Sequence, residues 1–302
     1  LFISSIAFTQ TPEQKAEIAS QYNQEKLESL KNRILESQLS AKNEVLELAR
    51  QNGWPTQYTF NKGFGYAEIV KVGPNGKPIY YQTDNVDAAT STRADYLNSG
   101  GSLGLSLDGQ GMTANVWDGG ATRTNHQEFD GAGGNNRVSQ GDGATSQSNH
   151  ATHVTGTIVA SGFTASAKGM APHAQAETFD WNSDLSEMTT EAANGMLVSN
   201  HSYGYGWRNQ NGQVQLPAWY GGAYIAEARD LDQILYNAPY YMMFSSGGND
   251  GTDDTANSSP LDGNSAYDKL NAFKCAKNNV VVAAANDANI NANGTLNSYT
   301  IA

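Results

Sequence analysis

Apolar positions follow a helical spacing in the first part of the chain. Between residues 11 and 50, leucine, isoleucine and valine recur every three or four positions among glutamate and lysine, which is typical of an amphipathic helix. Asn52-Gly53 predicts the end of this helix. Two strand-like runs follow, at residues 66–72 and 77–82, and Gly73-Pro74-Asn75-Gly76 between them predicts a tight hairpin turn. The first part of the chain is therefore expected to form a small helix-plus-hairpin unit.

From Gly109 onward the pattern changes to short apolar runs that alternate with helical stretches. Strands are expected at residues 113–117, 176–179, 196–201, 241–245 and 280–284, and helices at residues 150–161, 218–236 and 267–277. Strands that alternate with helices favour an α/β fold, a three-layer domain with a mostly parallel sheet and helices on both faces. In such sheets, functional side chains gather beyond the carboxyl ends of the strands.

Three polar side chains stand where this rule predicts a site. Asp118 follows a predicted strand, His150 opens a predicted helix, and Asn249 follows a strand-like run. An aspartate can fix the tautomer of a histidine, and an asparagine amide can donate a hydrogen bond to a developing oxyanion. Each residue also has an ordinary structural explanation, as a cap, a solvated side chain or a turn residue. Together they predict a catalytic set that lacks a nucleophile.

The acidic composition narrows the classes of partner. The 302 residues include 30 aspartates and glutamates against 18 lysines and arginines, a net charge of −12. Such a surface repels phosphate backbones and anionic lipids, so we expect no nucleic-acid and no membrane partner. No apolar run is long enough for a transmembrane helix. With Cys275 as the single cysteine, an internal disulfide bond is excluded.

Five short motifs occur in the second part of the chain. They are V-W-D-G-G at residues 116–120, H-A-T-H-V-T-G-T at 150–157, K-G-M-A-P at 168–172, N-H-S-Y-G at 200–204 and S-G-G-N at 246–249. In this order they resemble the D-[ST]-G, H-G-T-H-V-A-G-T, x-G-V-A-P, N-x-S-x-G and A-A-G-N motifs of the subtilisin-like serine proteases, the subtilase family. The resemblance covers residues 109–302 and implies a subtilisin-like fold and serine endopeptidase activity.

The resemblance implies a role for each matching residue of the catalytic set. Asp118 would orient the catalytic histidine, and His150 would act as general base and then as general acid. His153, one helical turn further on, would be structural. The side-chain amide of Asn249 would form part of the oxyanion hole.

The resemblance also implies a cleft for polypeptide substrates. Ser202, Tyr203 and Gly204 would line this cleft and offer backbone groups to an extended substrate strand. Gly248 would face the primary specificity pocket.

The chain departs from the family pattern at three points. Gly119 replaces a serine or threonine, and Ala151 replaces a glycine, a change that a helix tolerates. The third departure concerns the nucleophile, which the family has in G-T-S-M-A, because no Gly-Thr-Ser occurs in this sequence. We expect the serine to lie beyond Ala302, so that the 302-residue chain itself is inactive. The alternative is a catalytically inactive binding module, a pseudoprotease, on the same fold.

The ends of the chain predict an exported precursor. Residues 1–9 are short, apolar and then polar, which is typical of the end of a signal peptide and implies a secreted protein. Residues 10–86 are expected to be a propeptide-like region, since subtilase propeptides occupy the cleft, assist folding and are later removed. Residues 87–108 would be a linker and the start of the mature chain, and residues 109–302 a C-terminally truncated peptidase domain.

Metal binding is a weaker expectation, and no cofactor is required for the implied catalysis. Zinc helices place two histidines four residues apart with a glutamate between them, whereas His150 and His153 are three apart without one. Subtilases often bind structural calcium, but no ligand set can be assigned here. The loop acids that could supply oxygen ligands are Glu128, Asp130, Asp250, Asp253 and Asp254.

Overall fold

The computed structural model describes residues 11–60, 65–83, 92, 94–101, 103–131, 136–164, 167–251, 253–257, 263–264, 268–285, 288–291 and 295–300. The predicted signal-peptide remnant and the predicted boundary between residues 86 and 87 lie outside these ranges.

Six parallel strands form the main sheet, in the order β10-β9-β7-β4-β6-β5. Their bounds are β4 (Thr113–Asp118), β5 (Val138–Gln140), β6 (Gln175–Asp180), β7 (Val198–His201), β9 (Met242–Ser246) and β10 (Val280–Val282). All five predicted strands are present, and β5 adds an edge strand to them. Because the strands are parallel, the carboxyl ends of β4, β7 and β9 meet at one edge of the sheet.

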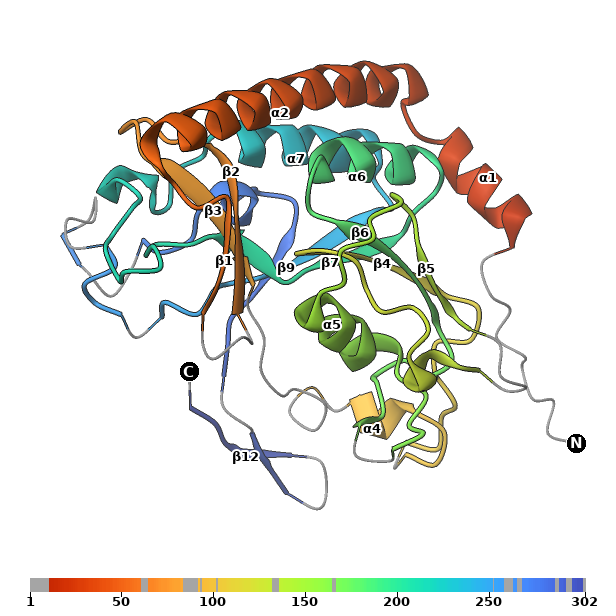
Figure 1. Ribbon diagram of the computed structural model, residues 1–302. Helices are drawn as coiled ribbons and strands as arrows, with labels where there is room; N and C mark the ends of the chain where they lie inside the picture. Colours follow the sequence, from red (N-terminus) through yellow and green to blue (C-terminus); the bar gives the residue numbers. More distant parts are fainter. Residues whose placement is uncertain are drawn as a thin grey trace, which may run out of the picture.

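Helices cover both faces of this sheet, so the predicted three-layer α/β arrangement is confirmed. α5 (Asn149–Val159) lies on one face, and α6 (Asp184–Ala193) and α7 (Ala226–Asn237) lie on the other (Figure 1). The shorter elements are α4 (Ala94–Leu97), η2 (Gln127–Phe129), η4 (Ala218–Tyr220), η5 (Ala272–Cys275) and the antiparallel pair β11 (Asn289–Ile290) and β12 (Leu296–Ser298).

Two predicted helices are wrong in extent. In the segment 218–236, the 3₁₀ turn η4 ends at a Gly-Gly pair whose second residue, Gly222, has a φ of +74°, and the helix begins only at Ala226. In the segment 267–277, the described residues form only the 3₁₀ turn η5. There Asp268 and Ala272 have φ values of +58° and +54°, and such left-handed residues interrupt a right-handed helix.

The N-terminal unit consists of α1 (Pro12–Ser20), α2 (Gln24–Asn52) and a hairpin of β2 (Gly65–Val72) and β3 (Pro78–Thr83), with β1 (Gln57–Phe60) beside β2. The side chain of Asn23 accepts a hydrogen bond from the Lys26 amide and begins α2, and Gly53, in the left-handed conformation, ends it. The predicted helix end and hairpin are therefore confirmed.

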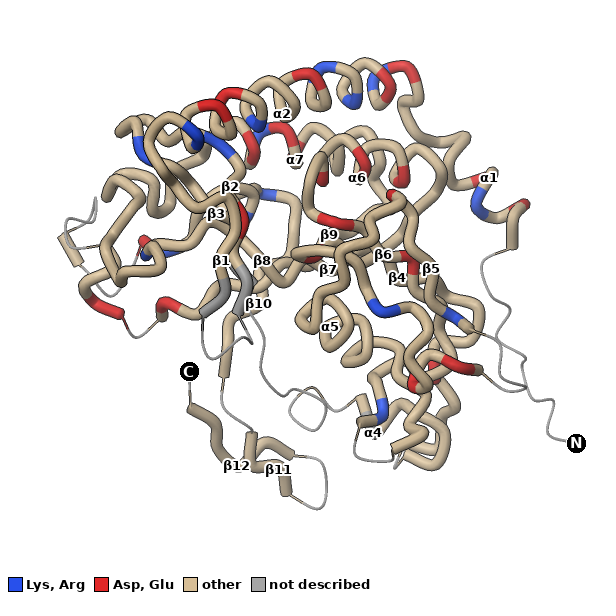
Figure 2. The backbone as a smooth tube through the Cα atoms, viewed as in Figure 1, with Lys and Arg blue, Asp and Glu red and all other residues tan. Residues whose placement is uncertain are grey.

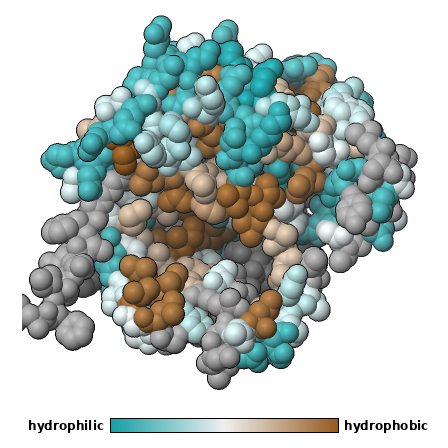
Figure 3. All heavy atoms as spheres, turned by 180° about the vertical axis from the view of Figure 1, so that it is seen from behind, coloured by the Kyte–Doolittle hydropathy of each residue, from teal (hydrophilic) through white to brown (hydrophobic). Residues whose placement is uncertain are grey.

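α2 joins the N-terminal unit to the main body. It lies along α6 and α7 and presents its charged side to solvent (Figures 1 and 2). Leu27, Leu30 and Ile34 on its inner side are each at most 2% exposed and belong to the main hydrophobic core. Seen from behind, hydrophilic residues cover the top of the molecule, and apolar residues gather around a hollow below them (Figure 3).

A short strand of the main body extends the N-terminal sheet. β8 (Tyr203–Tyr205) pairs antiparallel with β3, which gives a four-stranded sheet in the order β1-β2-β3-β8. Tyr81 lies opposite Tyr205, position 82 opposite Gly204, and position 83 opposite Tyr203. The N-terminal unit thus reaches the same edge of the main sheet at which the predicted site residues lie.

Candidate active site

Asp118 and His150 form a buried pair at the carboxyl end of β4. Asp118 Oδ1 lies 2.7 Å from His150 Nδ1, and the two residues are 1% and 9% exposed. In the neutral imidazole this contact holds the proton on Nδ1, which makes Nε2 the basic nitrogen. The pair has the geometry of an acid that orients a general base.

The local sequence explains why the two side chains meet. Asp118 is the last residue of β4, and its Oδ1 also accepts the Gly119 amide at 2.7 Å. Gly120 has a φ of +98°, and a Cβ atom there would lie 2.8 Å from the Ser146 carbonyl oxygen, so only glycine fits this turn. The Ser148 side chain caps α5, which places His150 in its first turn.

A cavity of about 630 Å³ opens beside His150. The residues that line it include four acids, Glu68, Asp142, Asp180 and Glu187. Burial raises the pKa of Asp180 to about 6 and the pKa of Glu187 to about 8. Glu187 is therefore largely protonated at pH 7, while its Oε2 accepts a hydrogen bond from Trp117 Nε1 at 3.0 Å.

The end of β7 and the following strand β8 turn their aromatic side chains inward. His201 is fully buried, and burial lowers its pKa to about 3, so it is neutral and structural. The hydroxyl groups of Tyr81 and Tyr203 both donate to Asp184 Oδ2, at 3.1 and 2.9 Å. The predicted cleft residue Tyr203 thus has its side chain in the core, and its backbone is the part that pairs with an extended strand, here β3.

Gly204 and Gly248 face a residue that the sequence analysis does not single out. A Cβ atom at Gly204 would lie 2.6 Å from Lys274 Nζ, and one at Gly248 would lie 3.4 Å from the same atom. Lys274 is only 5% exposed. The signal for it in the sequence is a lone lysine in the run N-A-F-K-C-A at residues 271–276.

The structure places the remaining predicted site residues at the same edge of the sheet. Asn249 is exposed and lies three residues beyond the end of β9. Ser202 lies between β7 and β8, and its hydroxyl accepts a hydrogen bond from Asn200 Nδ2 at 3.0 Å. β7 lies between β9 and β4 in the sheet. The strand that precedes Asn249 and the strand that ends in Asp118 are therefore the two neighbours of β7.

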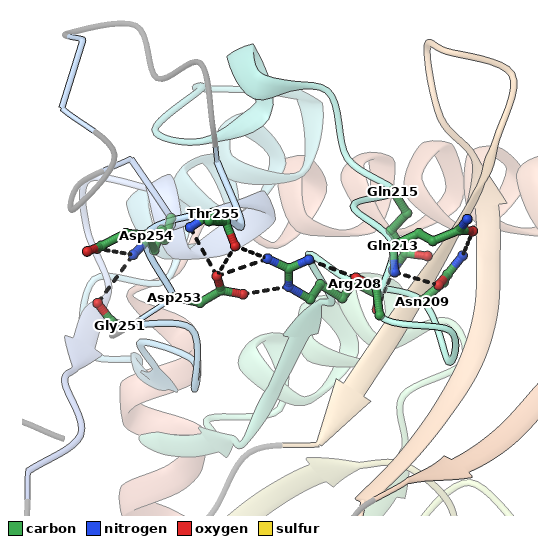
Figure 4. A network of polar contacts seen from close by, with 10 residues as sticks. Arg208, Asn209, Gln213, Gln215, Gly251, Asp253, Asp254 and Thr255 are labelled. Carbon is green, nitrogen blue, oxygen red and sulfur yellow. Dashed lines mark hydrogen bonds and ion pairs between the residues drawn. The ribbon is translucent and has the colours of Figure 1, made fainter.

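Two of the acids considered as calcium ligands have other partners. Arg208 holds Asp253 through two hydrogen bonds of 2.5 and 2.9 Å, and Thr255 joins the same network (Figure 4). This pairing lowers the pKa of Asp253. Burial raises the pKa of Glu128, but hydrogen bonds from the backbone amides of residues 162–164 outweigh it and lower that pKa overall. Within the described ranges, no three His, Cys, Asp or Glu side chains are grouped to hold a metal ion.

The sequence and the fold of this chain have counterparts among known proteins. The sequence model of the Subtilase family matches residues 40–301. Among solved structures, the Clostridium perfringens CspB protease is similar over 55% of this chain, with 17% sequence identity and a TM-score of 0.39, and the match covers 42% of that protein's chain. No curated protein matches the sequence significantly. In the part of the chain that the structure describes, no helix has the length and apolar character of a membrane span.

Proposed function

The chain belongs to the Subtilase family, and from this premise we propose that it is a secreted serine endopeptidase that uses Asp118, His150 and a serine as its triad. The 2.7 Å contact between Asp118 Oδ1 and His150 Nδ1 supports this proposal most directly. In this mechanism His150 Nε2 takes the proton of the serine hydroxyl as the oxygen attacks the scissile carbonyl. The same proton then passes to the leaving amine, while Asp118 stabilises the imidazolium.

The nucleophile and the oxyanion hole complete the proposed mechanism. The family resemblance implies a serine in a G-T-S-M-A motif as the nucleophile, and residues 1–302 contain no Gly-Thr-Ser. The Asn249 amide donates to the oxyanion of the tetrahedral intermediate. Its place beyond β9, on the same edge of the sheet as Asp118, supports this role.

Residues 10–86 are proposed to act as the propeptide of the enzyme. The antiparallel pairing of β3 with β8 supports this role, because β8 contains the backbone that the family resemblance assigns to substrate binding. The apolar start of the chain supports export.

The test of the catalytic assignment uses the natural full-length protein with casein as substrate. His150→Ala should lower kcat by several orders of magnitude, because members of a triad act as a unit. His153→Ala, the same change at an exposed position of α5, is the matched control and should stay within tenfold of wild type. Equal turnover in wild type and His150→Ala would overturn the assignment. An inactive wild type that binds unfolded polypeptide would instead support the binding module.

Asn249→Ala tests the oxyanion hole separately. We expect kcat to fall about 10²–10³-fold with little change in KM, because the amide acts on the transition state and not on the bound substrate. An effect confined to KM would make Asn249 a substrate-binding residue.

A further inference from the structure

The position of Lys274 is set by contacts of the residues that precede it, at the start of η5. Asn271 Nδ2 donates to the Tyr205 carbonyl at 3.0 Å, and the Tyr205 amide donates back to Asn271 Oδ1 at 3.2 Å. Phe273 is fully buried and packs edge-on against Tyr203, with ring centroids 5.5 Å apart. The residues before Lys274 are therefore attached to the backbone and side chains of β8.

The two glycines leave room for the lysine between β8 and the segment after β9. A Cβ atom at Gly204 would lie 2.4 Å from Lys274 Cε. Any residue larger than glycine at position 204 would therefore displace the lysine side chain. Gly248 has a φ of +104°, which side chains other than glycine rarely adopt. One ammonium group thus lies within contact distance of both β8 and the segment after β9.

The direction of β3 relates this ammonium group to the scissile bond. β3 runs antiparallel to β8, from Tyr205 toward Tyr203, and so toward the carboxyl end of β7. β7 neighbours β4, whose last residue is Asp118. A substrate strand that pairs with β8 in the same way as β3 would run toward the Asp118–His150 pair. Its carboxyl-terminal end would then lie nearest to that pair. Side chains beside Lys274 would then lie just before the scissile bond.

We infer that Lys274 selects substrates with an aspartate or glutamate immediately before the scissile bond, an inference that rests on the proposed function. A carboxylate between Gly204 and Gly248 would form a charge-assisted hydrogen bond with the ammonium group. An amide or an apolar side chain would interact more weakly with this ammonium group, and a basic side chain would be repelled by it.

The experiment compares peptide substrates that differ only in the residue before the scissile bond. With the natural full-length protein, kcat/KM should be about 10- to 100-fold higher for aspartate or glutamate than for the isosteric asparagine or glutamine. Lys274→Met should bring this ratio to within twofold of unity, and Lys274→Arg should keep most of it. Turnover of a leucine substrate by Lys274→Met shows that the variant is folded.

Lys277→Met is the matched control, because Lys277 is an exposed lysine three residues further on, stacked on Tyr224. It should leave the ratio of acid to amide substrates unchanged.

The outcomes separate this inference from the proposed function. Labelling by a fluorophosphonate without any acid preference overturns the role of Lys274 and leaves the serine peptidase intact. A ratio that Lys274→Met does not change has the same consequence. Absence of both labelling and hydrolysis overturns the proposed function and this inference together.

Discussion

The Asp118–His150 pair and the edge around Lys274, which we propose for catalysis and for substrate binding, are built in different ways. Asp118 and His150 are 32 residues apart and belong to a strand and a helix that pack directly on each other. The edge around Lys274 depends on contacts such as the one between Asn271 and Tyr205, 66 residues apart, and on β3 from the N-terminal unit. In the proposed enzyme, the regular α/β framework would thus fix the chemistry, whereas irregular segments brought together from a distance would fix what is bound.

The largest effect is expected at the catalytic pair. Asp118→Asn in the full-length protein should lower kcat by about 10⁴-fold, because an amide favours the wrong tautomer of His150. Steady-state hydrolysis of a peptide substrate measures this change. Asp254→Asn, at a side chain that is 68% exposed, is the control. A loss of less than tenfold would mean that Asp118 does not orient the base.

The substrate-binding edge should respond in stability as well as in specificity. Asn271→Ala removes both hydrogen bonds to the Tyr205 backbone and leaves buried backbone groups without those partners, which should cost about 1–3 kcal/mol of unfolding free energy. Urea titration measures the loss, and the preference for acidic substrates should fall in the same variant. Asn278→Ala, at an exposed position beyond η5, should change neither quantity.

A pH effect should arise beside the catalytic pair from Glu187. Its folded-state pKa of about 8 lies above the ordinary value of 4.5, so between these pH values the folded chain binds a proton that the unfolded chain does not. The contribution of this group to the free energy of unfolding therefore falls as pH rises through that window. Glu187→Gln should remove this fall and stabilise the protein at pH 9 on the order of 1–3 kcal/mol.

Urea titrations between pH 5 and 9 test the Glu187 effect. Glu36→Gln, on the exposed side of α2, is the control and should follow the wild-type curve. Parallel curves for wild type and Glu187→Gln would show that the carboxyl group titrates normally.

The smallest effect is expected from metal removal. Because the proposed chemistry uses only side chains, EDTA should leave kcat of the full-length enzyme within twofold of its starting value. The melting temperature measured with and without EDTA tests for structural calcium, and its recovery with Ca²⁺ but not Mg²⁺ would support such a site. A loss of kcat restored only by added metal would contradict a purely side-chain mechanism.

Strand positions and the contact between Asp118 and His150 were accessible from the sequence because both depend on short-range patterns. Apolar runs such as 113–117 are strands in the structure, and the polar residue that follows, Asp118, meets the histidine that opens the next helix. The parallel sheet brings such residues to one edge whatever their separation in the chain.

The irregular segments could not be predicted in the same way. Helical periodicity in 267–277 gives no indication that Asp268 and Ala272 adopt left-handed backbone conformations, and so the 3₁₀ turn that positions Lys274 was missed. α6 was missed because its sequence mixes polar and apolar residues, and its buried Asp184 is stabilised by distant partners such as Tyr81 and Tyr203. Such contacts follow from the assembled fold and not from local spacing.

The pairing of β3 with β8 also has a consequence for how these two strands separate. Both strands belong to one polypeptide, so their effective concentration for each other depends on the connecting chain and not on the amount of protein in solution. Dilution therefore cannot separate them. Once a peptide bond between them is hydrolysed, the same contact becomes bimolecular, and its occupancy then depends on total concentration and on the dissociation rate. Hydrolysis of a single peptide bond would thus make the contact between β3 and β8 depend on the protein concentration.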